Sequence, residues 1–173
     1  HSKSKYFMGL ALMQASKVLG KTKTNPAVGC VIVKNNNVIS AASTSINGRP
    51  HAESNALKNI KKNDKNVSLY STLEPCTHYG KTSPCVNKIA NKKIKKVFFS
   101  IKDPDIRTYS KSTSILRKNK IRVSSNIISL QVNNFYRSYI KFKKKRFPFV
   151  TCKLAVSKDL YLNNKRSKNI TNN

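Results

Sequence analysis

Two cysteines and a histidine constrain how this chain can fold, because they form a metal site only where separate segments meet. Cys76 and Cys85 lie within the stretch 72–85, and His51 lies upstream with Glu53 two residues after it. One His and two Cys are three protein ligands, the number typical of a catalytic zinc site with an open fourth position. We therefore expect the fold to bring His51 to both thiols, with Glu53 beside the open position.

The spacing of these residues narrows the chemistry. His51-Ala52-Glu53 and Pro75-Cys76 fit the H-x-E and P-C parts of a zinc deaminase site, in which the glutamate moves protons and is not a ligand. The second thiol follows at C-x8-C instead of C-x2-C, and the residues between suit a phosphorylated polar ring, with Lys81 as the expected phosphate partner. The alternative is a structural zinc closed by His78, which would leave Glu53 without a role.

Apolar runs and helical periodicities alternate along the chain. The run 27–33 is apolar throughout, which is typical of a strand buried on both faces, and residues 4–18 repeat apolar side chains at helical spacing. The other expected strands are 38–44, 67–73, 94–101, 121–124 and 149–156, and the other expected helices are 51–65 with a basic tail, 85–91, 112–119 and 127–142. This alternation predicts a three-layer α/β sandwich.

The charge is strongly basic. The chain has 35 Lys and Arg against 6 Asp and Glu, a formal net charge of +29, which is typical of proteins that bind nucleic acid. However, the basic residues form short dispersed runs such as Lys61-Lys62 and Lys143-Lys144-Lys145, without interleaved aromatic residues. We interpret them as a solvated surface and do not expect a nucleic-acid partner.

Hydropathy and cysteine content indicate the compartment. No apolar run is long enough to cross a bilayer, so we expect no membrane partner. The four cysteines, Cys30, Cys76, Cys85 and Cys152, are too few for a disulfide-stapled scaffold of this length. Reduced thiols and a cytoplasmic location are the expectation, with Cys30 a core thiol inside its apolar strand.

Four segments together resemble a known family. Residues 25–33, His51-Ala52-Glu53, 72–85 and Asp103-Pro104 are similar to the deaminase domain of bacterial riboflavin biosynthesis, diaminohydroxyphosphoribosylaminopyrimidine deaminase, in the cytidine deaminase-like superfamily. The resemblance covers about residues 4–145 and implies an α/β/α sandwich with a mixed, mostly parallel five-stranded sheet. It also implies hydrolytic deamination of a phosphoribosylated diaminopyrimidine, with release of ammonia.

The resemblance also implies roles for individual residues. Zinc would be held by His51, Cys76 and Cys85, with Glu53 as the proton shuttle. By motif position, the residues implied to hold the pyrimidine or its ribose phosphate are Asn25, His78, Lys81 and Asp103. The chain departs from the family at Thr44, where members usually have a His, and over 105–110, where they usually have an Asn and a Gly-containing loop.

The resemblance further predicts the domain organisation. We expect a zinc-dependent deaminase domain over 1–145 and a C-terminal extension over 146–173, in which residues 147–159 resemble the first strand of the family's reductase domain. No Gly-rich dinucleotide-binding loop is present in the sequence, so we expect a separate reductase polypeptide to act on the product. A homodimer is expected from the resemblance alone.

Two other functions remain compatible with the sequence. A zinc-dependent deaminase of a nucleic-acid base, tRNA adenosine or cytosine, would suit the basic charge but not the C-x8-C loop. A zinc-stabilised basic binding module without catalysis would suit both the charge and the ligands, but would give Glu53 no function.

Overall fold

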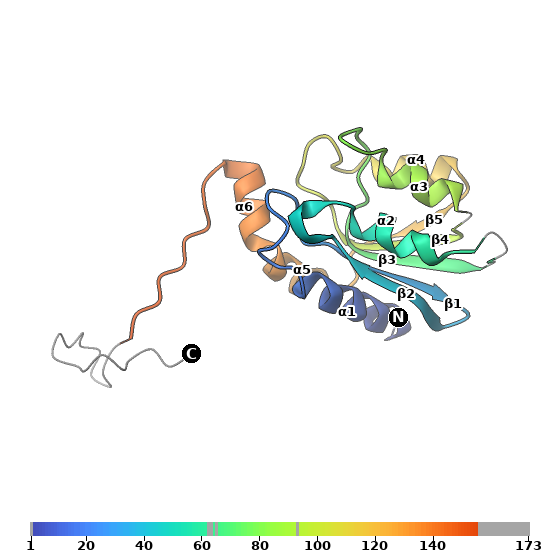
Figure 1. Ribbon diagram of the computed structural model, residues 1–173, viewed down its shortest axis with the longest axis horizontal. Helices are drawn as coiled ribbons and strands as arrows, with labels where there is room; N and C mark the ends of the chain where they lie inside the picture. Colours follow the sequence, from blue (N-terminus) through green and yellow to red (C-terminus); the bar gives the residue numbers. More distant parts are fainter. Residues whose placement is uncertain (1, 62–63, 65, 93, 156–173) are drawn as a thin grey trace.

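A mixed β-sheet forms the middle layer of the molecule. The computed structural model describes residues 2–61, 64, 66–92 and 94–155, and within these residues five strands pair in the order β2-β1-β3-β4-β5 (Figure 1). The strands are β1 (Gly29–Lys34), β2 (Asn37–Ser43), β3 (Val67–Leu73), β4 (Lys96–Ile101) and β5 (Arg122–Ser124). β1 is antiparallel to both of its neighbours, whereas β3, β4 and β5 are parallel. Four strands therefore run in one direction, which confirms the predicted mixed, mostly parallel sheet.

Helices cover both faces of this sheet. α1 (Ser2–Ser16) and α5 (Ser129–Phe135) lie on one face. α2 (Ala52–Ala56), α3 (Cys85–Asn91) and α4 (Ser112–Lys118) lie on the other (Figure 1). α6 (Arg137–Lys145) stands at one end of the sheet, and short 3-10 helices occupy Ile46–Gly48 and Leu57–Asn59. The predicted three-layer α/β/α sandwich is confirmed. In the described part of the chain, no helix combines the length and apolarity that a membrane span requires.

β1 shows why the run 27–33 is apolar at every position. Cys30 and Ile32 belong to the core under α2 and α3, whereas Val31 and Val33 pack with Phe7 and its neighbours on α1. Because successive side chains of a strand point to opposite faces, a strand covered on both sides must be apolar throughout. The expectation from the run 27–33 is confirmed.

Gly29 marks a close approach between α1 and β1. A Cβ built on Gly29 would lie 1.8 Å from the carbonyl oxygen of Ala11 and 2.7 Å from the amide nitrogen of Ala15. Both contacts are with backbone atoms, so no side-chain rotation can relieve them. We expect Gly29→Ala to lower the free energy of unfolding by about 2–3 kcal/mol, measured by urea denaturation. Gly9→Ala is the control, since nothing lies within 4 Å of a Cβ there; equal stability of the two variants would contradict the close packing.

Three predicted elements are wrong. The helix expected over 127–142 is broken into α5 and α6 at Tyr136, whose hydroxyl contacts Thr72 and the carbonyl of Ala27 in the sheet layer. The helix expected over 51–65 is shorter: α2 is followed by the 3-10 turn, which ends at Asn59. Most of the expected basic tail therefore follows the helix, and its residues 62, 63 and 65 are outside the described part.

The strand expected over 149–156 is the third of these. Residues 149–155 form no strand, extend away from the body of the molecule (Figure 1) and leave Val150 76% and Leu154 66% exposed. Val156 lies outside the described residues. An apolar run becomes a strand only where a sheet edge or a second layer receives it.

Candidate active site

Three segments bring the predicted metal ligands together. His51 precedes α2 as its N-cap residue, with extended backbone (φ −68°, ψ 158°), and Cys85 is the first residue of α3. Cys76 lies in the loop that leaves the carboxyl end of β3, where open α/β sheets place their ligands. His51 Nδ1 is 3.6 Å from Cys76 Sγ and 3.5 Å from Cys85 Sγ, and the ligand atoms all lie within 4.8 Å of one another.

These distances fit zinc. Zn–N bonds of about 2.05 Å and Zn–S bonds of about 2.3 Å at a tetrahedral angle place N and S about 3.6 Å apart. The two N···S distances of 3.5 and 3.6 Å match that geometry without any movement of the backbone. The His51, Cys76 and Cys85 side chains therefore make a donor set that suits zinc, with a fourth position free of protein ligands among the described residues.

Hydrogen bonding already favours a thiolate in this cluster. The hydrogen bond from Cys85 lowers the pKa of Cys76 to about 4, despite the opposing effect of burial. The same bond and burial raise the pKa of Cys85, while the hydrogen bond with Cys76 raises the pKa of His51. Cys76 also accepts the backbone N–H of Cys85 at 3.2 Å. Since the thiolate is the form that binds metals, Cys76 is already in the form that a metal ligand requires.

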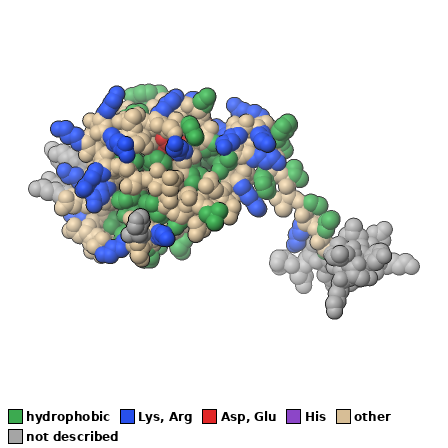
Figure 2. Space-filling view, turned by 180° about the vertical axis from the view of Figure 1, so that it is seen from behind, with side chains coloured by type: hydrophobic (Ala, Val, Ile, Leu, Met, Phe, Trp, Pro, Cys, Tyr) green, Lys and Arg blue, Asp and Glu red, His purple; other side chains and the backbone are tan. Residues whose placement is uncertain are grey.

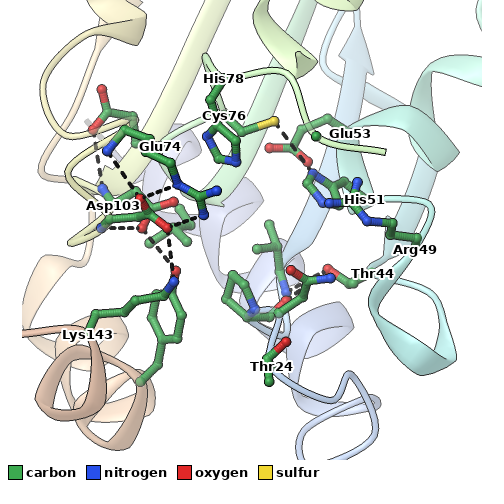
Figure 3. A pocket seen from close by; sticks show the side chains of 18 residues that line it. Thr24, Thr44, Arg49, His51, Glu53, Glu74, Cys76, His78, Asp103 and Lys143 are labelled. Atoms are coloured by element: carbon green, nitrogen blue, oxygen red, sulfur yellow. Dashed lines mark hydrogen bonds and ion pairs between the residues drawn. The ribbon is translucent and has the colours of Figure 1, made fainter. Parts of the chain in front are cut away.

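Glu53 lies beside the ligands in the first turn of α2. Its carboxylate is buried, accepts the Ser71 hydroxyl at 3.4 Å and the Cys85 thiol at 3.6 Å, and faces His51 and Cys76 (Figure 3). Burial raises the pKa of Glu53. A buried carboxylate at this distance can exchange protons with a molecule held at the cluster, as the sequence predicts.

A pocket opens in front of the cluster, and three of the predicted substrate residues line it. Asn25 donates its amide to the Gly48 carbonyl at 3.1 Å, which leaves its side-chain oxygen free to accept. His78 Nδ1 is 3.2 Å from the Thr108 hydroxyl. Asp103 accepts the Tyr139 hydroxyl at 3.1 Å, and burial raises its pKa to about 6.

Lys81 does not join them. It lies on the exposed part of the 76–85 loop and is absent from the residues that line the pocket. The structure therefore does not bring the predicted phosphate partner to the site.

Thr44, the departure from the family pattern, is tied to the backbone. It is 1% exposed, its hydroxyl accepts the Val28 N–H at 3.0 Å and lies 3.2 Å from the Pro26 carbonyl. The side chain therefore supports the wall of the pocket that carries Asn25.

Several pocket residues were missed by sequence reasoning. They are Thr24, Arg49, Glu74, Asp105, Arg107, Tyr139 and Lys143. One compositional signal could have found two of them: the chain has only 6 Asp and Glu, and four of these carboxylates, Glu53, Glu74, Asp103 and Asp105, line the pocket. No comparable signal marks Tyr139 and Lys143, which lie on α6, far along the chain from the metal-ligand motifs.

Glu74 holds one wall of the pocket in place. It is 2% exposed, and its Oε2 accepts the N–H groups of Asp103 at 3.2 Å and Ser110 at 3.0 Å. Its Oε1 accepts the N–H of Ser112 at 3.1 Å and the Ser112 hydroxyl at 2.8 Å. A single buried carboxylate therefore shapes the loop 103–112, from which Asp103, Asp105 and Arg107 reach the pocket.

We expect Glu74→Gln to loosen this loop. An amide has one acceptor oxygen, and its NH2 group would face buried N–H donors, so the free energy of unfolding should fall by about 2–4 kcal/mol. Urea denaturation of this variant and of Ser112→Ala, which removes one hydrogen bond and should cost only about 1 kcal/mol, checks the expectation. Wild-type stability of Glu74→Gln would mean that the carboxylate does not organise the loop.

The comparisons with known proteins agree with this geometry. Residues 1–101, more than half of the chain, match the family model described as the cytidine and deoxycytidylate deaminase zinc-binding region. The chain belongs to this family. The match includes His51, Glu53, Cys76 and Cys85.

Individual relatives are more specific. The chain is 34% identical over 146 residues to a diaminohydroxyphosphoribosylamino-pyrimidine deaminase of Buchnera aphidicola subsp. Schizaphis graminum, covering 84% of this chain and 99% of that protein. It is 34% identical over 154 residues to the riboflavin biosynthesis protein RibD of Bacillus amyloliquefaciens, covering 89% of this chain and 42% of that protein. The structure of Acinetobacter baumannii RibD, form 2, superposes with a TM-score of 0.85 at 34% identity, covering 91% of this chain and 45% of that one.

The chain thus spans less than half of the RibD proteins, and nearly all of the shorter Buchnera relative. The predicted resemblance to the deaminase domain of riboflavin biosynthesis is confirmed. The expected division of this chain at residue 145 stays a prediction.

Proposed function

We propose that this chain catalyses the zinc-dependent hydrolytic deamination of 2,5-diamino-6-(5-phosphoribosylamino)pyrimidin-4(3H)-one to 5-amino-6-(5-phosphoribosylamino)uracil, with release of ammonia. The observation that carries this proposal is the position of buried Glu53 beside the His51, Cys76 and Cys85 donor set. The identity to a relative named for this activity over 99% of its length supports the choice of substrate.

The chemistry divides between the metal and the chain. When bound to His51, Cys76 and Cys85, zinc would supply a Lewis acid that lowers the pKa of water to near neutrality. Glu53 accepts one proton of the attacking water and delivers it to a ring nitrogen of the pyrimidine. It then accepts the second proton, from the hydroxyl added to the ring carbon, and delivers it to the departing amino group, so that the C–N bond breaks and ammonia leaves. Its burial keeps bulk water from competing for that proton.

The pocket residues orient the ring for this transfer. The side-chain oxygen of Asn25 can accept an N–H of the pyrimidine, since its amide donates to Gly48. Burial and nearby Arg107 lower the pKa of His78, so that it serves as a neutral hydrogen-bonding group. Asp103 lies farther from the metal ligands and suits the ribose hydroxyls (Figure 3).

A nucleic-acid base deaminase is the second candidate, and the net charge of +29 favours it. Figure 2, however, shows Lys and Arg side chains scattered over the visible face without one dominant cluster. A polynucleotide substrate would give activity that falls steeply with salt, through counterion release. A deaminase that acts on the ribotide should instead keep most of its activity between about 50 and 200 mM salt.

The test is ammonia release from the diaminopyrimidine ribotide, with zinc content measured on the same sample. One zinc per chain with turnover supports the proposal. One zinc per chain without turnover on this substrate overturns it, and nucleic-acid substrates then become the choice.

The cellular setting belongs to the same proposal. We place the reaction in the cytoplasm, where thiols such as Cys76 and Cys85 stay reduced and available to zinc. A homodimer and a separate reductase polypeptide that acts on the product complete the proposal, and sedimentation analysis of the purified chain tests the dimer.

A further inference from the structure

The pocket has two ends. His51 and Arg49 lie at one end, and Asp103 and Lys143 lie on the opposite side (Figure 3). Under the proposed function, the ring carbon that loses its amino group must lie at the metal end. The ribosyl arm of the substrate, with its phosphate, then extends toward the Asp103 and Lys143 end.

Two cations converge at that far end on one carboxylate. Arg107 donates from Nε to Asp105 Oδ1 at 2.9 Å and from Nη2 to Asp105 Oδ2 at 2.6 Å. Lys143, which comes from α6, donates to the same Oδ2 at 2.9 Å. Asp105 is 8% exposed, and the hydrogen bond from Arg107 holds its pKa well below the usual range. It therefore stays ionised and fixes the two cations next to each other.

Both cations retain unused donors. A guanidinium has five N–H groups and an ammonium has three, so Arg107 keeps about three and Lys143 about two after pairing with Asp105. Two other carboxylates line this end of the pocket, but Glu74 accepts the N–H groups of the 103–112 loop and Asp103 accepts the Tyr139 hydroxyl, so the unused donors here belong to Arg107 and Lys143. Fixed, adjacent donors of this kind suit a phosphate, which accepts several charge-assisted hydrogen bonds at once.

The other pocket-side cations fit this role less well. Arg49 lines the metal end and donates to the Thr82 hydroxyl at 3.2 Å. Lys81 is exposed and lies outside the pocket wall. Among the described Lys and Arg residues, only Arg107 and Lys143 combine a place in the pocket wall with a position away from the metal ligands.

We propose that Arg107 and Lys143, held together by Asp105, bind the phosphate monoester on the ribosyl arm of the substrate. α6 thereby contributes a specificity determinant to a site whose chemistry comes from α2 and α3. This assignment rests on the proposed function for its substrate, and it replaces Lys81 as the phosphate partner.

The first test measures binding without turnover. Ribose 5-phosphate is titrated into the zinc-loaded protein and followed by phosphorus NMR. We expect Lys143→Met to weaken binding about 10- to 100-fold, the usual effect of losing a hydrogen bond to a charged group, and Lys143→Arg to retain most of the affinity. Lys145→Met removes the same charge from an exposed position on the same helix, and binding should not change. Unchanged binding by Lys143→Met, or an equal loss in Lys145→Met, would overturn the proposal.

The second test measures KM for the ribotide and for the riboside that lacks the phosphate. Lys143→Met should raise KM for the ribotide by a similar factor and leave KM for the riboside unchanged, with Lys81→Ala changing neither. An equal rise for both substrates, or a rise only in Lys81→Ala, would overturn the subsite while the deaminase proposal stands. If the wild type releases no ammonia but Lys143→Met still binds ribose 5-phosphate more weakly than the wild type, the phosphate site stands and the proposed reaction is wrong.

Discussion

Replacing Glu53 with glutamine is expected to reduce the rate of ammonia release by about 10²- to 10⁴-fold, the usual contribution of a general acid–base group. Glutamine has nearly the same shape and can still accept the Ser71 hydroxyl, but it cannot take a proton from water or return one to the leaving group. Because Glu53 is not among the three metal ligands, zinc content should remain at one per chain. Steady-state kinetics and metal analysis on the same preparation check both parts.

Asp64→Asn is the matched control for Glu53→Gln. It also removes one negative charge, but Asp64 pairs with Lys34 at 2.8 Å, and neither residue is among those that line the pocket. Its activity should equal that of the wild type. If Glu53→Gln released ammonia at the wild-type rate, Glu53 would have no catalytic role. The hypothesis of a zinc-stabilised basic binding module would then be favoured.

Replacing Cys85 with alanine is expected to abolish zinc binding and activity together. Two protein ligands remain, and a structural or catalytic zinc needs at least three to compete with water. Cys85 is 1% exposed and lies against Cys76 and His51, so the variant loses a ligand from the centre of the cluster. Zinc measured by mass spectrometry of the purified protein should fall from one per chain to nearly none, and His51→Ala should behave in the same way.

Cys30→Ala separates loss of a ligand from loss of a buried thiol. Cys30 is also fully buried, but it lies within β1 in the main core, and it is absent from the ligand cluster. It should keep its zinc and its activity, at a cost of about 1 kcal/mol in unfolding free energy. Retention of zinc by Cys85→Ala would show that the metal is held elsewhere, and the assignment of the active site would be wrong.

Local sequence signals were sufficient for several elements. The strand expected over 67–73 matches β3, and the helix expected over 85–91 matches α3. In β3 the residues Val67, Leu69, Tyr70 and Leu73 lie between turn residues, and in α3 Pro84 directly precedes the helix, so neither prediction needed a distant contact. The candidate site was predictable for another reason, since His51 and Glu53 form an H-x-E motif and Cys76 and Cys85 form a C-x8-C motif.

One of the wrong predictions failed because of distant contacts. The break between α5 and α6 falls at Tyr136, whose hydroxyl donates to the Ala27 carbonyl 109 positions away and contacts Thr72. Within the segment 127–142 itself, helical periodicity gives no reason to stop there. The segment 149–155 reads as a strand because it is apolar, yet no strand forms there.

The sequence by itself therefore determined the family and the layered α/β fold, and it predicted that His51, Cys76, Cys85 and Glu53 would meet at one site. The fold depends on hydrophobic periodicity, which is a local property, whereas the four site residues, although distant in sequence, are recognisable because they match the motifs of a known family. Only the tertiary structure decided the far side of the pocket, where Glu74 organises the loop 103–112 and Lys143 of α6 reaches Asp105. Those contacts join residues 29 to 38 positions apart, and their energies come from burial and hydrogen-bond geometry that no local pattern encodes.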